Sequence, residues 1–294
     1  MKKTIKKASL AGFCYGVKRA LDLTLQIKNQ NPEKDVYVLG ELIHNSQVIE
    51  ELLSKGIEII HCVEEIKNPQ NSICIIRTHG ATPEEIKQIQ AKGCQILDAT
   101  CIDVKMVQEK AKSLIKEGYK LFIVGKDDLP EVIGIKAHAE ENTEEKAIIL
   151  SSKEDIEKYI DEIKKSKKIG IVSQTTQKTE NLQDILSELI KFAKEIKVYN
   201  TICATTAKRQ SEAKLLAKEV DLMIVVGSHS SANTSHLYEI LKDITTTIHI
   251  ETEKELSGYD NLIEKAKNIG VTAGASTPEF IINKVIETIE LKGE

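Results

Sequence analysis

A threefold internal repeat restricts the fold of this chain more than any other feature of its sequence. Apolar runs end in glycine at three places, in VYVLG, LFIVG and LMIVVG, which end at Gly40, Gly125 and Gly227. A polar loop follows each run: ELIHNSQV, KDDLPEV and SHSSANTS. A second set of strand-like runs, in ICIIRTHGATPEEI, IGIVSQTTQKTENL and IGVTAGASTPEFI, leads into amphipathic helical patterns. Such self-similarity indicates that one structural unit is used three times.

Three cysteines occupy the same phase of this repeat. Short strand-like runs lead directly into Cys14, Cys101 and Cys203, in KKASLAGFC, CQILDATC and IKVYNTIC. A helical pattern follows each cysteine, and the separations from Cys14 to Gly40, Cys101 to Gly125 and Cys203 to Gly227 are nearly equal. Six cysteines placed at random would rarely put three of them at one phase of a threefold repeat.

Each unit contains alternating strands and helices, which predicts parallel α/β architecture. GIEII, KAIIL and TTIHI add a further strand to each, so a unit reads cysteine, helix, strand, loop, strand, strand, loop, helix, strand. The third unit lacks a closing strand, and the N-terminal run KKTIKKASL can supply it. We predict three domains, 14–100, 101–202 and 203–294 completed by 1–13, closed into a ring. The carboxyl ends of the strands, where α/β sheets bind ligands, then surround a common centre.

Composition narrows the class of protein. The chain has 294 residues and a formal net charge of −4, so no basic excess points to nucleic acid. No apolar run approaches the roughly 18 residues that a membrane helix needs, and the N-terminus does not resemble a signal peptide. We therefore expect a cytosolic protein without nucleic acid or membrane partners. Its six cysteines are then reduced rather than paired in disulfides.

Three converging thiolates are most simply explained as metal ligands. They could bind one metal ion, a three-iron cluster, or a four-iron cubane with one iron left uncovered. Thiolates select zinc, copper(I) or iron–sulfur clusters, and catalytic zinc more often has mixed ligands. Three inert buried cysteines would not explain the common phase. Cys62, Cys74 and Cys94 have no counterparts in the other units and are expected to pack as hydrophobes.

Polar side chains gather in the loops at the predicted strand ends. Hydroxyl, amide and imidazole groups at helix N-termini can bind an anion without a large positive charge. Glu131 is a candidate general acid, and histidine can relay protons near neutral pH. His61, His138, His229, His236 and His249 are expected to be solvated or structural. The candidate site residues are His44, His79, Glu131, Thr175, Ser231, Asn233 and Ser276.

These segments together resemble the 4-hydroxy-3-methylbut-2-enyl diphosphate reductase family, an iron–sulfur oxidoreductase family of isoprenoid biosynthesis. The resemblance runs from AGFCYGVKRA through LGELIHNSQV, RTHGA, DATC, SQTT, NTIC and VVGS to VTAGAST, and covers almost the whole chain. It implies a trefoil of three α/β domains around a 4Fe–4S cluster. The implied cluster ligands are Cys14, Cys101 and Cys203, with one iron not bound by cysteine.

The resemblance also implies the reaction and the roles of the loop residues. The allylic hydroxyl of 4-hydroxy-3-methylbut-2-enyl diphosphate would be removed with two electrons and two protons, giving isopentenyl and dimethylallyl diphosphates. Glu131 would deliver protons, and Thr175 would order the substrate hydroxyl. Reduced ferredoxin or flavodoxin would supply the electrons. The residues implied to hold the diphosphate are His44, His79, Ser231, Asn233 and Ser276.

The chain departs from the family pattern at three positions. Leu129 replaces a histidine of the usual His-Pro-Glu, Ala232 replaces a serine of Ser-Ser-Asn, and Ile102 replaces the proline after Cys101. The first two changes each remove a donor to the diphosphate. A hydrogen bond to a charged group contributes about 1.5–3 kcal/mol, so each loss is expected to weaken binding roughly tenfold or more. Lys126, His138 or His229 are candidates for compensation.

Four hypotheses follow from these features. We favour a reductase of this family over a diverged paralogue that uses the same cluster on a different substrate. A cluster-based redox or iron sensor predicts a cluster without turnover. A structural zinc protein predicts stoichiometric zinc and no acid-labile sulfide.

Overall fold

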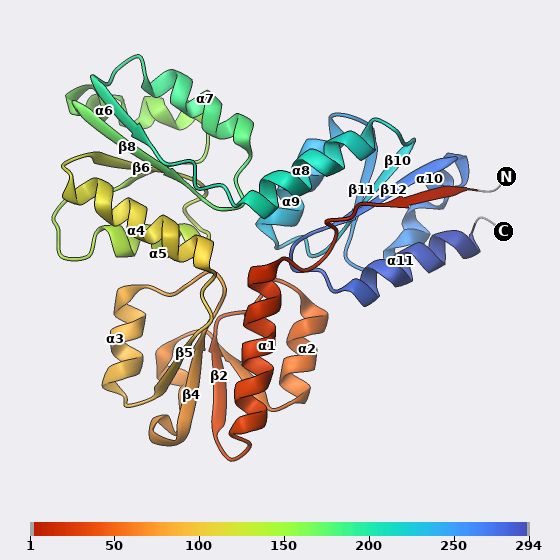
Figure 1. Cartoon of the computed structure of the whole chain (residues 1–294), viewed down its shortest axis with the longest axis horizontal. Coiled ribbons are helices and arrows are strands. Elements are labelled where there is room, and N and C mark those ends of the chain that lie inside the picture. Colours follow the sequence, from red (N-terminus) through yellow and green to blue (C-terminus); the bar gives the residue numbers. More distant parts are fainter. Residues whose placement is uncertain (1–2, 293–294) are drawn as a thin grey trace. The chain divides into compact units, whose positions relative to one another are not determined.

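The computed structural model describes residues 3–292, which contain three four-stranded sheets built of parallel strands (Figure 1). The chain forms two compact units. Unit 1 contains the residues up to Lys18, Ile43–Glu51 and the chain from Ala204 onward. Unit 2 contains Arg19–Leu42 and Leu52–Cys203. The prediction of three parallel α/β repeats is confirmed, whereas the residue boundaries of the three domains stay predictions.

The first sheet has the strand order β3-β2-β4-β5. Val36 of β2 pairs with Ile57 on one side and with Ile73 on the other. The strands are β2 (Asp35–Leu39), β3 (Ile57–Ile60), β4 (Ser72–Ile76) and β5 (Gln95–Asp98), and the helices are α1 (Tyr15–Gln30), α2 (Ser46–Ser54) and α3 (Pro83–Ala91), with 3-10 turns at Val63–Glu65 and Pro69–Asn71.

The second sheet repeats this order as β7-β6-β8-β9. Phe122 of β6 pairs with Ile148 and with Ile171. Its strands are β6 (Lys120–Val124), β7 (Ile148–Leu150), β8 (Lys168–Ser173) and β9 (Glu195–Val198), and its helices are α4 (Ile102–Lys116), α5 (Pro130–Ala139), α6 (Ile160–Lys165) and α7 (Thr179–Leu189), with a 3-10 segment at Lys153–Tyr159.

The third sheet has the order β11-β10-β12-β1, and its fourth position is taken by the N-terminal strand. Ile5 of β1 pairs in parallel with Ile269 of β12, which is the arrangement expected for the N-terminal run. The elements are β1 (Thr4–Lys7), α8 (Ala204–Ala217), β10 (Leu222–Val226), α9 (Ala232–Lys242), β11 (Thr246–Ile250), a 3-10 segment at Glu253–Tyr259, α10 (Asp260–Lys265), β12 (Asn268–Ala273) and α11 (Glu279–Leu291).

The expectation of a simple loop between the first and second strands of each of the three repeats was wrong. Helices α2, α5 and α9 occupy these connections. The physical reason is that two neighbouring parallel strands need a crossover of a dozen or more residues, which is usually helical. Each polar loop is therefore the short approach to a helix N-terminus. This difference places the predicted loop residues at the first turns of helices.

Alternate residues of the central strands build a core on each face of the sheet, as expected for parallel strands. In the second sheet, Leu121 and Ile123 face α4 and α5, while Phe122 and Val124 face α6 and α7. The third sheet follows the same scheme, with α8 and α9 on one face and α10 and α11 on the other.

The strand order creates a switch point in every sheet. In each repeat the chain passes from the central first strand to the edge strand on one side of it. It then crosses back to the strand on the other side of the first strand. Ligands bind in α/β sheets in the crevice outside the carboxyl ends of the strands at such a point. The switch points lie between β2 and β4, between β6 and β8, and between β10 and β12. The loops with the predicted site residues follow these six strands.

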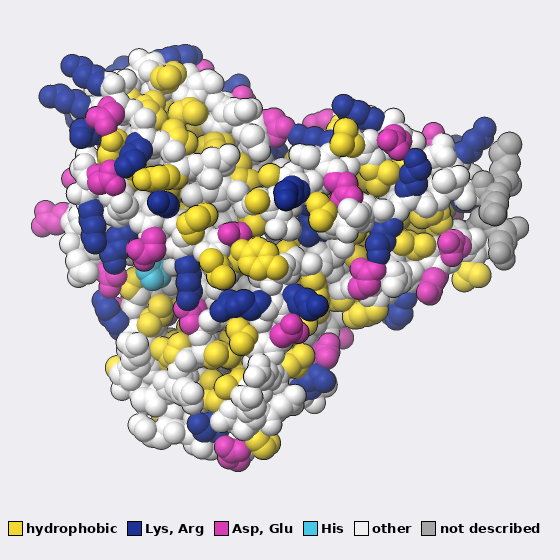
Figure 2. All heavy atoms as spheres, in the orientation of Figure 1, with side chains coloured by type: hydrophobic (Ala, Val, Ile, Leu, Met, Phe, Trp, Pro, Cys, Tyr) yellow, Lys and Arg dark blue, Asp and Glu magenta, His cyan; other side chains and the backbone are white. Residues whose placement is uncertain are grey.

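Surface charge and helix lengths add two observations. On the face shown in Figure 2, Lys and Arg side chains are interspersed with Asp and Glu. Within residues 3–292, every helix is too short or too polar to span a bilayer.

Candidate active site

Glu131 and Thr175 meet at the switch point of the second sheet, in unit 2. Glu131 is the second residue of α5, and Thr175 follows the end of β8. The backbone N–H of Thr175 donates to Oε1 of Glu131 at 2.6 Å, and its hydroxyl donates to Oε2 at 2.8 Å. Both residues are buried, with 3% and 6% of their surface exposed. A carboxyl group is thus held in one orientation away from bulk water.

This environment makes Glu131 a group that exchanges a proton near neutral pH. Burial raises the pKa of its carboxyl from 4.5 to about 7. The two hydrogen bonds from Thr175 lower this pKa, and the charge of Asp103 raises it. Burial is the largest of these effects because desolvation disfavours the charged form. A general acid is most effective when its pKa lies near the working pH.

Cys203 is joined to this pair through the backbone. Its N–H donates to the carbonyl of Thr175 at 2.9 Å, and its Sγ lies 2.8 Å from Oδ2 of Asp103. Cys101 immediately precedes α4, and its N–H donates to the carbonyl of Thr78 at 3.0 Å. Asp103 was missed by the sequence analysis, because its contact with Cys203 joins positions a hundred residues apart in the chain.

His79 lies in the loop that follows β4, and two side chains of the neighbouring repeat adjoin this loop. Nε2 of His138, on α5, lies 3.0 Å from the carbonyl oxygen of Ala81. Gln108, on α4, lies so close to Gly80 that a Cβ there would be 3.0 Å from its Nε2. His79 and the helix that carries Glu131 are therefore parts of one packed assembly within unit 2.

Unit 1 contains the other predicted residues, beginning with Cys14, Ser276 and His44. The N–H of Cys14 donates to the carbonyl of Ala275 at 3.2 Å. The hydroxyl of Ser276 donates to the carbonyl of His44 at 3.2 Å. These two bonds bring the loops after β1, after β12 and before α2 together at the β10–β12 switch point.

Ser231 and Asn233 lie at the N-terminus of α9 in the same unit. Ser231 caps the helix, since its hydroxyl accepts the N–H of Thr234 at 3.4 Å. Asn233 is 6% exposed, and among the described residues its buried Nδ2 has no hydrogen-bond partner. A buried donor without a partner costs free energy, so Nδ2 is suited to bind an acceptor from a ligand.

The residues around the three predicted cluster ligands fit an iron–sulfur cluster. Cys14, Cys101 and Cys203 are each partly exposed and each stands directly before a helix, α1, α4 and α8. Thiolate is the form that binds iron, and a helix N-terminus favours negative charge. The Sγ of Cys14 also accepts the N–H of Val17 at 3.5 Å. Within the described part of the chain, no group of three or more His, Cys, Asp or Glu residues has the arrangement of a metal-ion site. Their joint role as ligands stays a prediction.

The remaining cysteines differ from these three. Cys74 and Cys94 are buried, and burial raises the pKa of Cys74 to about 12 and also raises that of Cys94. Both match the expected packing role. For Cys62 that expectation was wrong, because its side chain is exposed in the loop after β3. The neighbouring Glu64 and Glu65 raise the pKa of the Cys62 thiol, which disfavours its thiolate.

The positions that depart from the family pattern lie at helix starts. Leu129 is the N-cap residue of α5, and its partly buried side chain packs on the core between α4 and α5. Ala232 is the first residue of α9. Of the candidates for compensation, Lys126 is exposed, His138 contacts Ala81, and the ring of His229 lies 4.1 Å from that of His249.

Arg209 is a buried, charged residue near the end of β12, and it was not among the predicted site residues. Its Nη1 donates to the carbonyl of Ala273 at 2.8 Å, and its Nη2 donates to that of Gly12 at 2.9 Å. It therefore ties the loop before Cys14 to the end of β12. The RQ dipeptide after NTIC was a sequence signal for this residue, although its role required the structure.

Known proteins match the chain over nearly its whole length. The family model described as LytB protein matches residues 5–290. The 4-hydroxy-3-methylbut-2-enyl diphosphate reductase of Clostridium tetani is 45% identical over 280 residues, which are 95% of this chain but only 42% of that protein. The enzyme of that name from Geobacter sulfurreducens is 40% identical over 284 residues, 96% of this chain and 95% of its own.

Solved structures agree with these matches. The solved structure of an (E)-4-hydroxy-3-methyl-but-2-enyl diphosphate reductase, the terminal enzyme of the non-mevalonate pathway, is 39% identical with a TM-score of 0.71, and the match covers 98% of this chain and 99% of that one. The E-1-hydroxy-2-methyl-but-2-enyl-4-diphosphate reductase of Plasmodium falciparum is 26% identical with a TM-score of 0.88, covering 98% and 88%. The resemblance and the fold class are thereby confirmed. The chain belongs to the LytB protein family, which includes the 4-hydroxy-3-methylbut-2-enyl diphosphate reductases.

Proposed function

We propose that this chain reductively removes the allylic hydroxyl of 4-hydroxy-3-methylbut-2-enyl diphosphate, giving isopentenyl and dimethylallyl diphosphates. The reaction consumes two electrons and two protons and releases water. Family membership supports the substrate and the reaction. The structural observation that carries the proposal is the buried Glu131–Thr175 pair, because a carboxyl with a pKa of about 7 can supply protons in a site closed to bulk water.

Cys14, Cys101 and Cys203 would hold a 4Fe–4S cluster with one iron not bound by cysteine. When bound, the cluster would supply electrons and a Lewis-acidic iron for the substrate oxygen. The backbone bond from Cys203 to Thr175 supports this assignment, because it places the Glu131 pair next to one of the proposed ligands.

Glu131 would deliver protons, and Thr175 would order the substrate hydroxyl. In its protonated form Glu131 can donate to the leaving hydroxyl, which then departs as water rather than as hydroxide. The Thr175 hydroxyl, 2.8 Å from Oε2, holds the carboxyl in place. A general acid usually raises a reaction rate about 10²–10⁴-fold. Here it would do so because the hydroxyl leaves as neutral water instead of hydroxide.

The diphosphate would bind to the loops at the β10–β12 and β2–β4 switch points. The proposed contacts are His44, His79, Ser231, Asn233 and Ser276. Nδ2 of Asn233, at the N-terminus of α9, supports this role because helix N-termini attract phosphate. Reduced ferredoxin or flavodoxin would supply the electrons.

The proposed reaction can be tested by turnover in D₂O under anaerobic conditions with a reduced viologen. Mass spectrometry is expected to find isopentenyl and dimethylallyl diphosphates that each carry one solvent deuterium on carbon. A substrate that is recovered unchanged from cluster-loaded protein would refute the proposal and favour the paralogue or the sensor. Zinc without sulfide in the same protein would favour the structural zinc site.

A further inference from the structure

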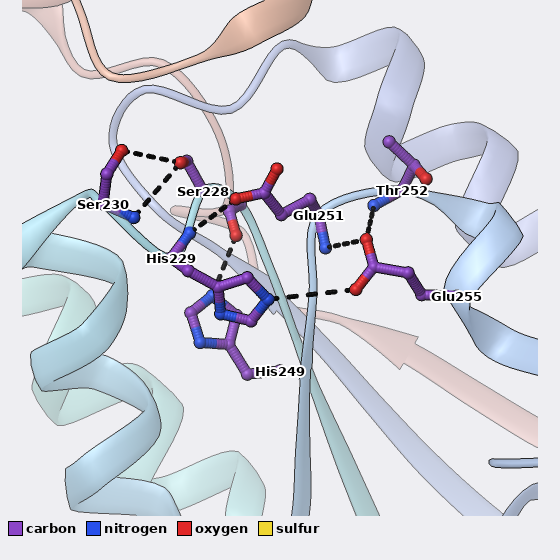
Figure 3. Close-up of polar contacts among 8 residues, drawn as sticks. Ser228, His229, Ser230, His249, Glu251, Thr252 and Glu255 are labelled. Atoms are coloured by element: carbon purple, nitrogen blue, oxygen red, sulfur yellow. Dashed lines mark hydrogen bonds and ion pairs between the residues drawn. The ribbon is translucent and has the colours of Figure 1, made fainter. Parts of the chain in front are cut away.

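The β10–α9 loop, residues 227–231, connects the end of β10 to the serine that caps α9. It ends at Ser231 and leads into α9, whose second residue is Asn233; the proposed function assigns both side chains to the diphosphate. In the strand order β11-β10-β12, the switch-point crevice lies on the β12 side of β10. Two side chains contact this loop from the β11 side: His249, within β11, and Glu251, just after it (Figure 3).

His249 makes the first of these contacts. It is the fourth residue of β11, and its Nε2 lies 2.8 Å from the carbonyl oxygen of Gly227. The carbonyl can only accept, so Nε2 must carry the hydrogen. Burial lowers the pKa of His249, which keeps the ring neutral at physiological pH. His249 therefore acts as a fixed donor to the first residue of the loop.

Glu251 makes the second contact, one residue beyond the end of β11. Its Oε1 accepts the backbone N–H of His229 at 2.8 Å. The backbone N–H of Glu251 in turn donates to Oε1 of Glu255 at 3.0 Å. Figure 3 shows this connected series, which runs from the loop through Glu251 to the 3-10 segment at Glu253–Tyr259.

The ring of His229 also points toward this side. It packs against His249 with the ring centroids 4.1 Å apart and the ring planes inclined by 53°, and its Nε2 lies 3.8 Å from Oε2 of Glu255. Figure 3 shows the two imidazoles side by side. His229 thus contributes its ring to the contacts with β11, and the expectation that it compensates at the diphosphate is not favoured by this orientation.

The β12 side leaves the loop no room to relax. Gly227 has a φ of +141°, and a Cβ at this position would lie 2.4 Å from Oγ1 of Thr277. At Gly274 the corresponding Cβ would lie 1.9 Å from Oγ1 of Thr234. The start of the loop is therefore packed against β12 and hydrogen-bonded to β11. The β11-side hydrogen bonds and the β12-side packing therefore hold the start of the loop from two sides.

We propose that His249 and Glu251 are positioning residues for substrate binding, which hold the β10–α9 loop so that Ser231 and Asn233 face the β10–β12 crevice. The inference rests on the proposed function, since it takes the diphosphate to be the ligand of these two side chains. Neither His249 nor Glu251 touches the substrate; both act through the backbone of Gly227 and His229.

The test compares variants that remove each hydrogen bond with variants that keep it. His249→Leu and Glu251→Ala are each expected to raise KM for the substrate about five- to tenfold, with kcat within about twofold of the wild type. The dissociation constant of inorganic diphosphate, measured by calorimetry on the unreduced anaerobic holoenzyme, should rise by the same factor. His249→Gln and Glu251→Gln should restore both values, because their amides can still donate to Gly227 and accept from His229.

Glu253→Ala is the matched control, since it removes the same charge two residues further along and should leave both constants unchanged. If His249→Leu and Glu251→Ala keep the wild-type KM and diphosphate affinity, the inference is overturned. It is also overturned if the Gln variants lose as much diphosphate affinity as His249→Leu and Glu251→Ala do. If His249→Leu does not fold, Glu251→Ala decides, because the half-buried side chain of Glu251 is not part of the hydrophobic core. If the wild type shows no turnover but the two variants bind inorganic diphosphate more weakly than the wild type, the proposed reaction is refuted while the positioning role is supported.

Discussion

Thr175 bonds to Glu131 through both of its donors, the backbone N–H to Oε1 at 2.6 Å and the hydroxyl to Oε2 at 2.8 Å. The two bonds fix the carboxyl in a place where burial alone would raise its pKa further. Burial and hydrogen bonding thus act in opposite directions, and their balance sets the pKa near 7. Most of the predictions below depend on this balance.

Glu131→Gln should reduce kcat by about 10²–10⁴-fold, because the amide keeps the shape of the side chain but cannot donate a proton as an acid does. In the wild type, kcat should fall as pH rises through about 7, where the acid form is lost. The pH profile of kcat, measured with excess viologen, checks both statements. A wild-type kcat that stays constant from pH 6 to pH 9 would contradict the second statement, and wild-type kcat in Glu131→Gln would contradict the first.

Protein stability should depend on the same group. The folded pKa of Glu131 lies above its ordinary value of 4.5, so the folded state binds the proton more tightly than the unfolded chain. Its stabilising contribution from proton binding is therefore full below about pH 4.5 and is lost as pH rises through about 7, with a total change of roughly 3 kcal/mol. Urea unfolding of metal-free protein at pH 5 and pH 8 should show a larger loss for the wild type than for Glu131→Gln. Equal losses would argue against the raised pKa.

Thr175→Val should move the alkaline limb of the pH profile to higher pH. The lost hydroxyl bond is one that lowers the pKa of Glu131, so its removal raises that pKa. Thr175→Ser keeps the hydroxyl and should retain the wild-type limb. kcat should also fall in the valine variant because the substrate hydroxyl is no longer ordered. A limb that stays in place in the valine variant would show that this bond does not tune Glu131.

Replacing any of Cys14, Cys101 and Cys203 by serine should abolish the cluster. Anaerobically purified variants are expected to lack the brown colour and most of the iron and sulfide of the wild type. Cys62→Ser is a suitable control because Cys62 is an exposed free thiol that does not precede α1, α4 or α8. Full iron and sulfide content in a Cys14→Ser variant would exclude Cys14 as a required ligand.

Leu129→His should lower KM for the diphosphate substrate by adding a donor at the start of α5. Leu129 is the N-cap residue directly before Pro130 and Glu131, so a new imidazole there adjoins the proposed site. The gain should be about tenfold if the histidine bonds to a charged phosphate oxygen. An unchanged or higher KM would place the diphosphate elsewhere.

The repeat was readable from sequence because strand ends and cysteines recur at one spacing, and strands buried on both faces give continuous apolar runs. The helices α2, α5 and α9 were missed because each is short and follows directly on a polar loop that begins at the glycine ending the preceding strand. Asp103, His249 and Glu251 could not be predicted as site residues. Their roles depend on contacts with Cys203, Gly227 and His229, which are distant in sequence.

The most direct test of the central claim is anaerobic turnover of 4-hydroxy-3-methylbut-2-enyl diphosphate, with iron and acid-labile sulfide counted on the same sample. We predict about four iron and four sulfide per chain, together with isopentenyl and dimethylallyl diphosphates as the products. Fully loaded protein that leaves the substrate unreduced would contradict the assigned function. Turnover by protein without iron and sulfide would contradict the proposal that the reaction needs an iron–sulfur cluster.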